Sequence, residues 1–137
     1  MSEVDWLINS RDNKNSEKHA YERQRRNMNE KLRRLRASKS VVSEIKSNIA
    51  DIRKRVKNSK DQLGKWQGSE YKWLKSFVQD DMASNYYWYY KDVDTVLDNI
   101  CDEISRLEKE DSRIGGIIGF LKDAITDLSN EIEKLFN

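Results

Sequence analysis

The chain has 137 residues, of which 36% are hydrophobic and 36% charged, and its formal net charge is +2. One domain fits this length, but so few apolar residues cannot fill a compact globular core, and no apolar run approaches the roughly 20 residues of a membrane span. The absence of proline, the presence of only five glycines and the lack of clear strand patterns predict an all-α protein with narrow apolar stripes on long helices.

The first predicted helical arm covers about residues 17–63. Apolar side chains recur there on a seven-residue grid, and Ile45 and Ile52 supply the companion position of a coiled-coil seam. The grid consists of Leu7, Tyr21, Met28, Leu35, Val42, Ile49, Val56 and Leu63, interrupted by Lys14. The polar segment 9–16 offers a break, so residues 1–16 either continue this arm or form a separate short helix.

A tip is predicted at residues 64–69, because Gly64 and Gly68 permit a helix stop and a tight reversal. The second arm then covers about residues 70–135, and its seam becomes regular from Val93 onward, with Asp111 as its one interruption. Matching arm lengths predict a long antiparallel two-helix hairpin, coiled-coil-like, of about 90 Å per arm. Asp111 and the glycines at 115 and 116 leave open a kink or break near residues 111–116, and with it a small three-helix bundle.

Charge divides between the arms. Residues 1–65 carry 18 Lys or Arg against 9 Asp or Glu, whereas residues 66–137 carry 8 against 15. A basic arm folded against an acidic one favours antiparallel pairing. The basic run from Arg23 to Arg36 would by itself suggest a phosphate-binding stripe. The acidic arm neutralises part of its charge, so no nucleic-acid binding is predicted. A nucleic-acid-binding helical protein is kept as a further alternative.

The sequence lacks a recognisable set of catalytic residues. There is one histidine, His19, and one cysteine, Cys101, and a folded hairpin would hold them about 20 Å apart along the helix. No phosphate-cradling loop or metal-ligand cluster accompanies them. We therefore predict no enzyme activity, no catalytic residue, no cofactor and no metal.

Aromatic residues gather just beyond the tip and form the candidate partner-binding site. Five consecutive rings, Tyr86 to Tyr90, must surround a helix axis, so some of them face away from the other arm and need another surface. The predicted binding and targeting residues are Trp66, Gly68, Tyr71, Trp73, Phe77, Asp81, Tyr86, Trp88 and Tyr90. A second apolar stripe for an incoming helix is expected from Leu32, Val41, Val78, Val96 and Phe120.

Two motifs carry a family resemblance. Trp66-Gln67-Gly68 resembles the Trp-x-Gly turn of the WXG superfamily of type VII secretion proteins. Together with Leu32-Arg33-Arg34-Leu35, Tyr71 and Phe77, and with Ile100 and Ile104 beyond, the pattern over residues 20 to 135 is similar to the YwqH-like family, small helical proteins associated with LXG toxins.

The resemblance implies a non-catalytic adaptor or chaperone-like protein that binds the helical LXG domain of a toxin, or other small helical hairpin proteins, and supports the toxin's stability or export. It also implies that Phe77 and Asp81 match a Phe-x-x-x-Asp targeting motif, whereas Tyr90 and Asp94, a possible export signal, lie inside the second helix. The alternative is a structural homodimeric coiled coil. Residues 1–10 lack the basic cluster of a Sec signal peptide, so a cytoplasmic location is expected, with co-export beside a toxin left open and no stable membrane insertion.

Overall fold

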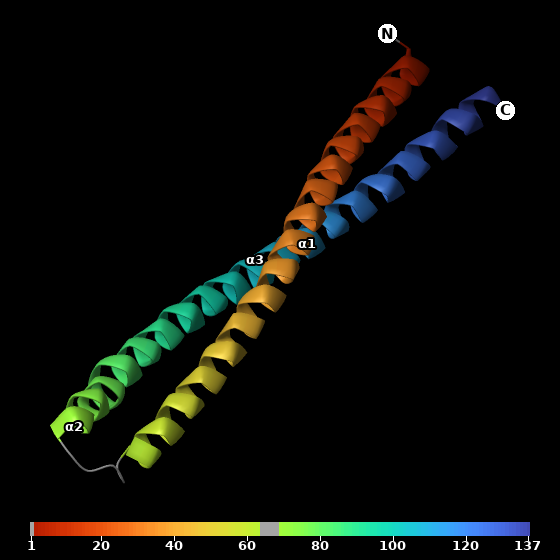
Figure 1. Ribbon diagram of the computed structural model, residues 1–137. Coiled ribbons are helices and arrows are strands. Elements are labelled where there is room, and N and C mark those ends of the chain that lie inside the picture. Colours follow the sequence, from red (N-terminus) through yellow and green to blue (C-terminus); the bar gives the residue numbers. More distant parts are fainter. Residues whose placement is uncertain (1, 64–68) are drawn as a thin grey trace. The chain divides into compact units, whose positions relative to one another are not determined.

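The computed structural model describes the backbone of residues 2–63 and 69–137, and the side chains of these ranges except 60–63, 69–71 and 79. In the described ranges the chain is all-α, a helical hairpin as predicted (Figure 1). Helix α1 covers Glu3–Leu63, α2 covers Ser69–Ser76, one π-helical segment, η1, covers Phe77–Met82, and α3 covers Ala83–Phe136. The predicted tip, at residues 64–69, lies outside the described residues except for Ser69.

Helix α1 begins at Glu3 because a reciprocal cap closes its first turn. The Asp5 amide donates to the Ser2 hydroxyl at 3.2 Å, and the Ser2 amide donates to the Asp5 carboxylate at 3.3 Å. This capping box satisfies amides that have no partner inside the helix. The helix then continues without interruption, so residues 3–16 extend the first arm and do not form a separate helix.

The chain divides into two compact units, one formed by Met1–Arg34 with Ile104–Asn137 and the other by Leu35–Glu103. In the first unit the buried apolar side chains come from both segments, and all of them except Leu32 belong to the predicted seams. They are Leu7, Met28, Leu32, Ile104, Leu107, Ile114, Ile118, Leu121 and Ile132. Each such side chain contributes about 1.5–3 kcal/mol when it is removed from water.

An ion pair explains the interruption of the second seam at Asp111. The Arg25 guanidinium donates from Nε to the Asp111 carboxylate at 3.0 Å, and both side chains are partly shielded from water. A Cβ atom on Gly115 would lie 3.2 Å from the same guanidinium, so the glycine leaves room for it. Polar pairs at a seam fix the register of two helices. Helix α3 is unbroken through residues 111–116, so the alternative of a broken second arm is wrong.

In the second unit the core lies between α1 and the α2 to α3 region. Val56 and Val78 are buried, and the half-buried Ile52, Leu74 and Met82 pack against them, with Ala83 and Tyr86. Lys46 pairs with Asp94, while Val56 meets residues near 78–86, so rising numbers in α1 face falling numbers in the partner segment. The two segments are therefore antiparallel, with the cation on the basic arm and the carboxylate on the acidic one.

The expected second apolar stripe is present only in part. Val41, Val96 and Phe120 are exposed, as predicted. Leu32 and Val78 are buried, so assigning them to an outward-facing stripe was wrong. Both belong to the internal packing of their own unit, because the seam is wider than a strict seven-residue grid.

Candidate interaction surface

The first part of the candidate surface lies where α2 runs into η1. Trp73 and Phe77, four residues apart, stack with their ring centroids 5.9 Å apart and their planes 12° from parallel. Trp73 is 72% exposed and Phe77 43% exposed, so both rings of the stacked pair are accessible to water. Neighbouring Asp81 is also exposed, so the Phe77 ring and the Asp81 carboxylate of the proposed targeting motif are both accessible.

The run from Tyr86 to Tyr90 at the start of α3 divides into inward and outward rings, as expected for consecutive residues on a helix. Tyr86 and Tyr90 are half-buried, and Tyr86 packs on the Val56 and Val78 core. Trp88 is 62% exposed and meets Tyr87 edge to face, with centroids 5.4 Å apart. Tyr89 is also exposed. Tyr86 thus serves the internal packing, whereas Trp88 lies on the accessible surface.

The π-helical segment decides which of these rings face inward. The inward residues are spaced by four along the chain: Leu74, Val78, Met82, Tyr86 and Tyr90. Four residues of α-helix turn through about 400°, so this spacing would rotate the inward face by roughly 40° at every step. A π-helix takes more residues per turn, because its hydrogen bonds join residues i and i+5. The segment Phe77–Met82 therefore offsets part of this drift, at the step from Val78 to Met82.

Two cations of α1, Arg53 and Lys46, lie against tyrosine rings at the start of α3. The Arg53 guanidinium lies 5.1 Å from the Tyr90 ring centroid and 5.2 Å from that of Tyr87. The Lys46 ammonium lies 5.4 Å from the Tyr90 centroid and also donates to the Asp94 carboxylate. That hydrogen bond, together with the negative charge of Asp94, raises the pKa of Lys46 above its ordinary value. These contacts fix the start of α3 against α1 within this unit.

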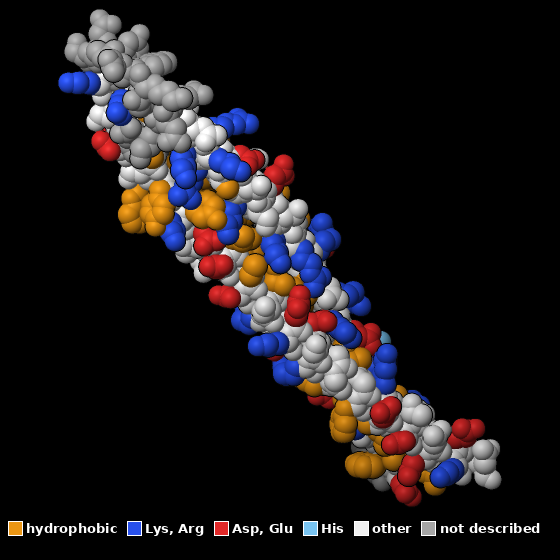
Figure 2. Space-filling model, turned by 90° about the horizontal axis from the view of Figure 1, so that it is seen from below, with side chains coloured by type: hydrophobic (Ala, Val, Ile, Leu, Met, Phe, Trp, Pro, Cys, Tyr) orange, Lys and Arg blue, Asp and Glu red, His pale blue; other side chains and the backbone are white. Residues whose placement is uncertain are grey.

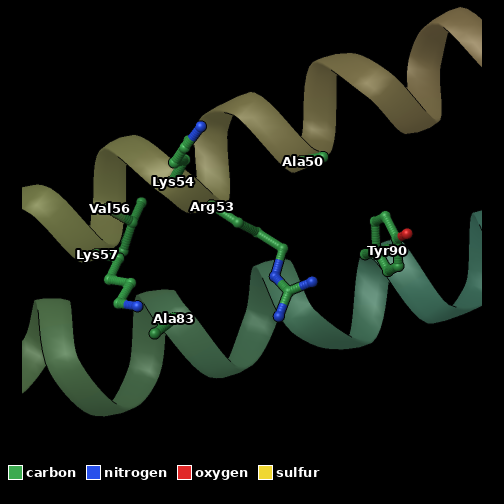
Figure 3. A pocket seen from close by; sticks show the side chains of 7 residues that line it. All are labelled: Ala50, Arg53, Lys54, Val56, Lys57, Ala83 and Tyr90. Carbon is green, nitrogen blue, oxygen red and sulfur yellow. The ribbon is translucent and has the colours of Figure 1, made fainter.

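Next to Tyr90 the surface is hollowed into a groove of about 440 Å³ (Figure 3). Its lining consists of Ala50, Arg53, Lys54, Val56, Lys57, Ala83 and Tyr90. In Figure 3 the side chains of Arg53 and Lys57 reach from α1 toward α3, and the Tyr90 ring rises from α3 toward α1. Of these residues, only Tyr90 was among the predicted binding residues. The i, i+4 spacing of Arg53 and Lys57, which places two cations on one helical face, is the sequence signal that could have indicated the groove.

The remaining predicted site residues are described less completely. Trp66 and Gly68 lie outside the described residues. Tyr71 belongs to α2, but its side chain is outside the described set. The residues that the structure does bring to one region, in α2, η1 and the start of α3, are Trp73, Phe77, Asp81, Trp88 and Tyr90.

Three arginines of the basic run in α1 pair with acids inside their own unit. Arg33 and Arg34 both donate to the Glu30 carboxylate, while Arg25 binds Asp111. The hydrogen bond from Arg33, assisted by the charges of Arg33 and Arg34, lowers the pKa of Glu30 to about 2. These pairs neutralise part of the positive charge of α1. This agrees with the interpretation of the arginine run as a solvated helix face.

The two groups considered for chemistry, His19 and Cys101, are not among the residues of this surface. His19 is exposed on α1, with Nδ1 3.8 Å from a Glu22 carboxylate oxygen, and Cys101 is half-buried on α3. Among the described residues, no cluster of His, Cys, Asp and Glu side chains is placed to hold a metal ion. No helix in the described part of the chain combines the length and the apolar composition that a membrane-spanning segment requires.

Comparison with known families agrees with the motif pattern. The model of the YwqH-like family matches residues 9–130, nearly the whole chain. The chain belongs to the YwqH-like family. The matched range of this YwqH-like protein includes all of α2 and η1, the rings of the candidate surface and the groove. No curated protein and no solved structure matches the chain.

Proposed function

We propose that this YwqH-like protein is a non-catalytic adaptor that binds the helical LXG domain of a toxin and supports the toxin's stability or its export by type VII secretion. The observation that carries the proposal is the exposure of Trp73, Phe77 and Trp88 on one unit of a helical hairpin. Large rings that the fold itself leaves uncovered are typical anchors of protein interfaces.

The exposed ring area is large enough to matter. With exposed fractions of 72%, 43% and 62%, and about 200 Å² per ring, Trp73, Phe77 and Trp88 leave on the order of 350 Å² of aromatic surface in water. A standard interface buries about 800 Å² on each partner. These three rings alone would supply nearly half of one side, and Tyr89 adds to it.

The setting of the rings favours a helical partner. They project from α2, η1 and α3, and exposed apolar residues such as Val41 and Val96 belong to the same unit. In Figure 2 hydrophobic side chains reach the visible surface in groups, with Lys and Arg side chains bordering one of them. An amphipathic helix that lays its apolar face on such a surface would complete a larger helical bundle. An LXG domain, or another small helical hairpin protein, offers helices of this kind.

Co-expression tests the proposal. The protein would be produced together with the LXG domain of a toxin whose gene neighbours its own, and the complex would be isolated through a tag on that domain. We expect Trp88→Ala to reduce the affinity at least tenfold, as for a central interface residue. Trp6→Ala is the matched control, since Trp6 is 60% exposed but belongs to the other unit, and it should change the affinity by less than twofold.

The molar mass from light scattering distinguishes the adaptor from the alternative, a structural homodimeric coiled coil. A complex of higher mass that contains both proteins supports the adaptor. A homodimer whose mass does not change when the LXG domain is added, or equal losses for both tryptophan variants, contradicts it and favours the structural coiled coil.

A further inference from the structure

We infer that the groove beside Tyr90 is a docking site for an acidic amphipathic helix. The inference deepens the proposed function and rests on it for one point, namely that the helix belongs to the adaptor's partner. Its starting observation is the contrast between the floor and the rim of the groove. The lining combines three apolar residues, Ala50, Val56 and Ala83, here called the floor, with three cations, Arg53, Lys54 and Lys57, here called the rim.

Among the described lining residues, the positive charge of the groove has no negative counterpart. None of them is a carboxylate, and Arg53 contacts the rings of Tyr87 and Tyr90 where an ion pair would otherwise be expected. Lys54 and Lys57 are exposed, and neither forms an ion pair with a described carboxylate. Elsewhere in this unit a cation of α1 does form an ion pair, between Lys46 and Asp94. In the described part of the chain the groove therefore presents three cations without a carboxylate partner, and acidic side chains of a bound molecule would neutralise them.

The dimensions decide how a partner would bind. An α-helix is about 10 Å across with its side chains, so a groove of about 440 Å³ takes inserted side chains and not a whole helix. Small residues, Ala50 and Ala83, allow a partner backbone to approach the floor. Arg53 and Lys57 are one helical turn apart, and acids with the same i, i+4 spacing on a partner helix would face both cations. An apolar side chain between these acids would cover Val56 and Ala83.

This arrangement favours an acidic helix over nucleic acid. A phosphate backbone carries no apolar group that would cover the floor. Its affinity also depends on many phosphate contacts, whereas the groove offers three cations within about one turn of α1. Lys54 points away from α3 (Figure 3), so it would meet the outer flank of a bound helix.

A synthetic peptide tests the inference directly. The probe is a fluorescein-labelled amphipathic helix with Glu at i, i+4 spacing around Leu and Ala, and its twin carries Lys in place of Glu. The groove variant is Lys54→Glu with Lys57→Glu. The control is Lys31→Glu with Lys39→Glu, which alters two exposed lysines of the same helix, outside the groove, by the same total charge. Circular dichroism confirms that both variants keep their helices.

The expected result is that the wild type prefers the acidic peptide over its twin. The groove variant should then lose at least tenfold in affinity for the acidic peptide and the control less than threefold. Equal losses in the two variants would show only a long-range charge effect and would overturn the inference. So would the absence of acidic-peptide binding, or groove-dependent binding of single-stranded DNA in its place.

The same variants, assayed against the LXG domain, separate this inference from the proposed function. If the wild type and both variants bind the domain equally, the adaptor stands and the groove is not its docking site. If the wild type does not bind the domain, the adaptor role fails, and the peptide measurement alone decides whether the groove takes an acidic helix.

Discussion

Replacing the exposed glycines of α3 with alanine should stabilise the protein. A Cβ atom added at Gly116 or at Gly119 meets no atom within 4 Å, so neither substitution creates a clash. Glycine inside a helix costs about 1 kcal/mol relative to alanine, because the unfolded chain loses more conformational freedom. Each substitution should therefore raise the free energy of unfolding by about 0.5–1 kcal/mol, and the pair by about twice as much.

Gly115 provides the internal comparison. Its helix propensity would improve by the same amount, but its Cβ would lie 3.2 Å from the Arg25 guanidinium. That contact is tighter than normal packing, so the guanidinium must shift while it keeps its 3.0 Å hydrogen bond to Asp111. Gly115→Ala should consequently stabilise the protein less than Gly116→Ala does, or destabilise it.

Thermal melts followed by circular dichroism measure these differences. For a chain of this length, 1 kcal/mol corresponds to about 4 °C in Tm, so the Gly116→Ala, Gly119→Ala double variant should melt about 4–8 °C higher. The reasoning is refuted if this variant melts lower than the wild type.

Three further predictions concern the first unit. Ile114→Ala should lower the free energy of unfolding by about 2–5 kcal/mol, because Ile114 is fully buried, whereas Phe120→Ser, at an exposed position, should change it by less than about 0.5 kcal/mol; urea unfolding compares the two. Asp111→Asn should cost about 0.5–1 kcal/mol at low salt, and the difference should shrink in about 1 M salt because the pair with α1 is partly exposed; a cost unchanged by salt would contradict an ion pair. Since the pKa of Glu30 is lowered from 4.5 to about 2, its interaction stabilises the folded state above pH 4.5 and is lost as the pH falls toward 2. A carboxyl NMR titration should show a midpoint near 2, and Arg33→Gln should return it toward the ordinary value; a midpoint near 4.5 in the wild type would disprove the pairing.

The seam was predictable because it depends only on sequence spacing. Ile104, Leu107, Ile114 and Ile118 recur at three and four residues, and all four are buried. Ile45, in contrast, is 38% exposed, so its assignment to the companion position of the first seam was wrong. Asp111 could be recognised as an interruption, but its partner could not. Pairing with Arg25 depends on the register of two segments that are distant in sequence, and several arginines on α1 were equally eligible.

The start of the second arm was harder to predict. Residues spaced by four, from Leu74 to Tyr90, fit neither the seven-residue grid nor a straight α-helix, and the sequence analysis found no regular seam before Val93. The π-helical segment offsets part of this mismatch. Its Val78 packs with Val56, which is distant in sequence, and local propensity does not encode such a contact. For the same reason the sequence indicated that some of the five consecutive rings face outward without showing which.

The groove was missed because its parts come from separate segments. Arg53 and Lys57 are ordinary basic residues of a basic arm, and Ala83 is an ordinary small residue at the start of α3. Only their juxtaposition makes an apolar floor with a positive rim. That some aromatic side chains are exposed was, in contrast, expected from their density, and the structure shows that Trp73 and Trp88 are among them.

The proposed function requires that a partner's helices cover the rings of α2, η1 and the start of α3. Hydrogen–deuterium exchange, measured on the protein alone and in the presence of a saturating LXG domain, tests it most directly. We expect slower exchange in residues 72–90 and in the facing part of α1, around residues 46–57, with little change in residues 3–34. Exchange that is unchanged in residues 72–90, or slowed only in the first unit, would contradict the account.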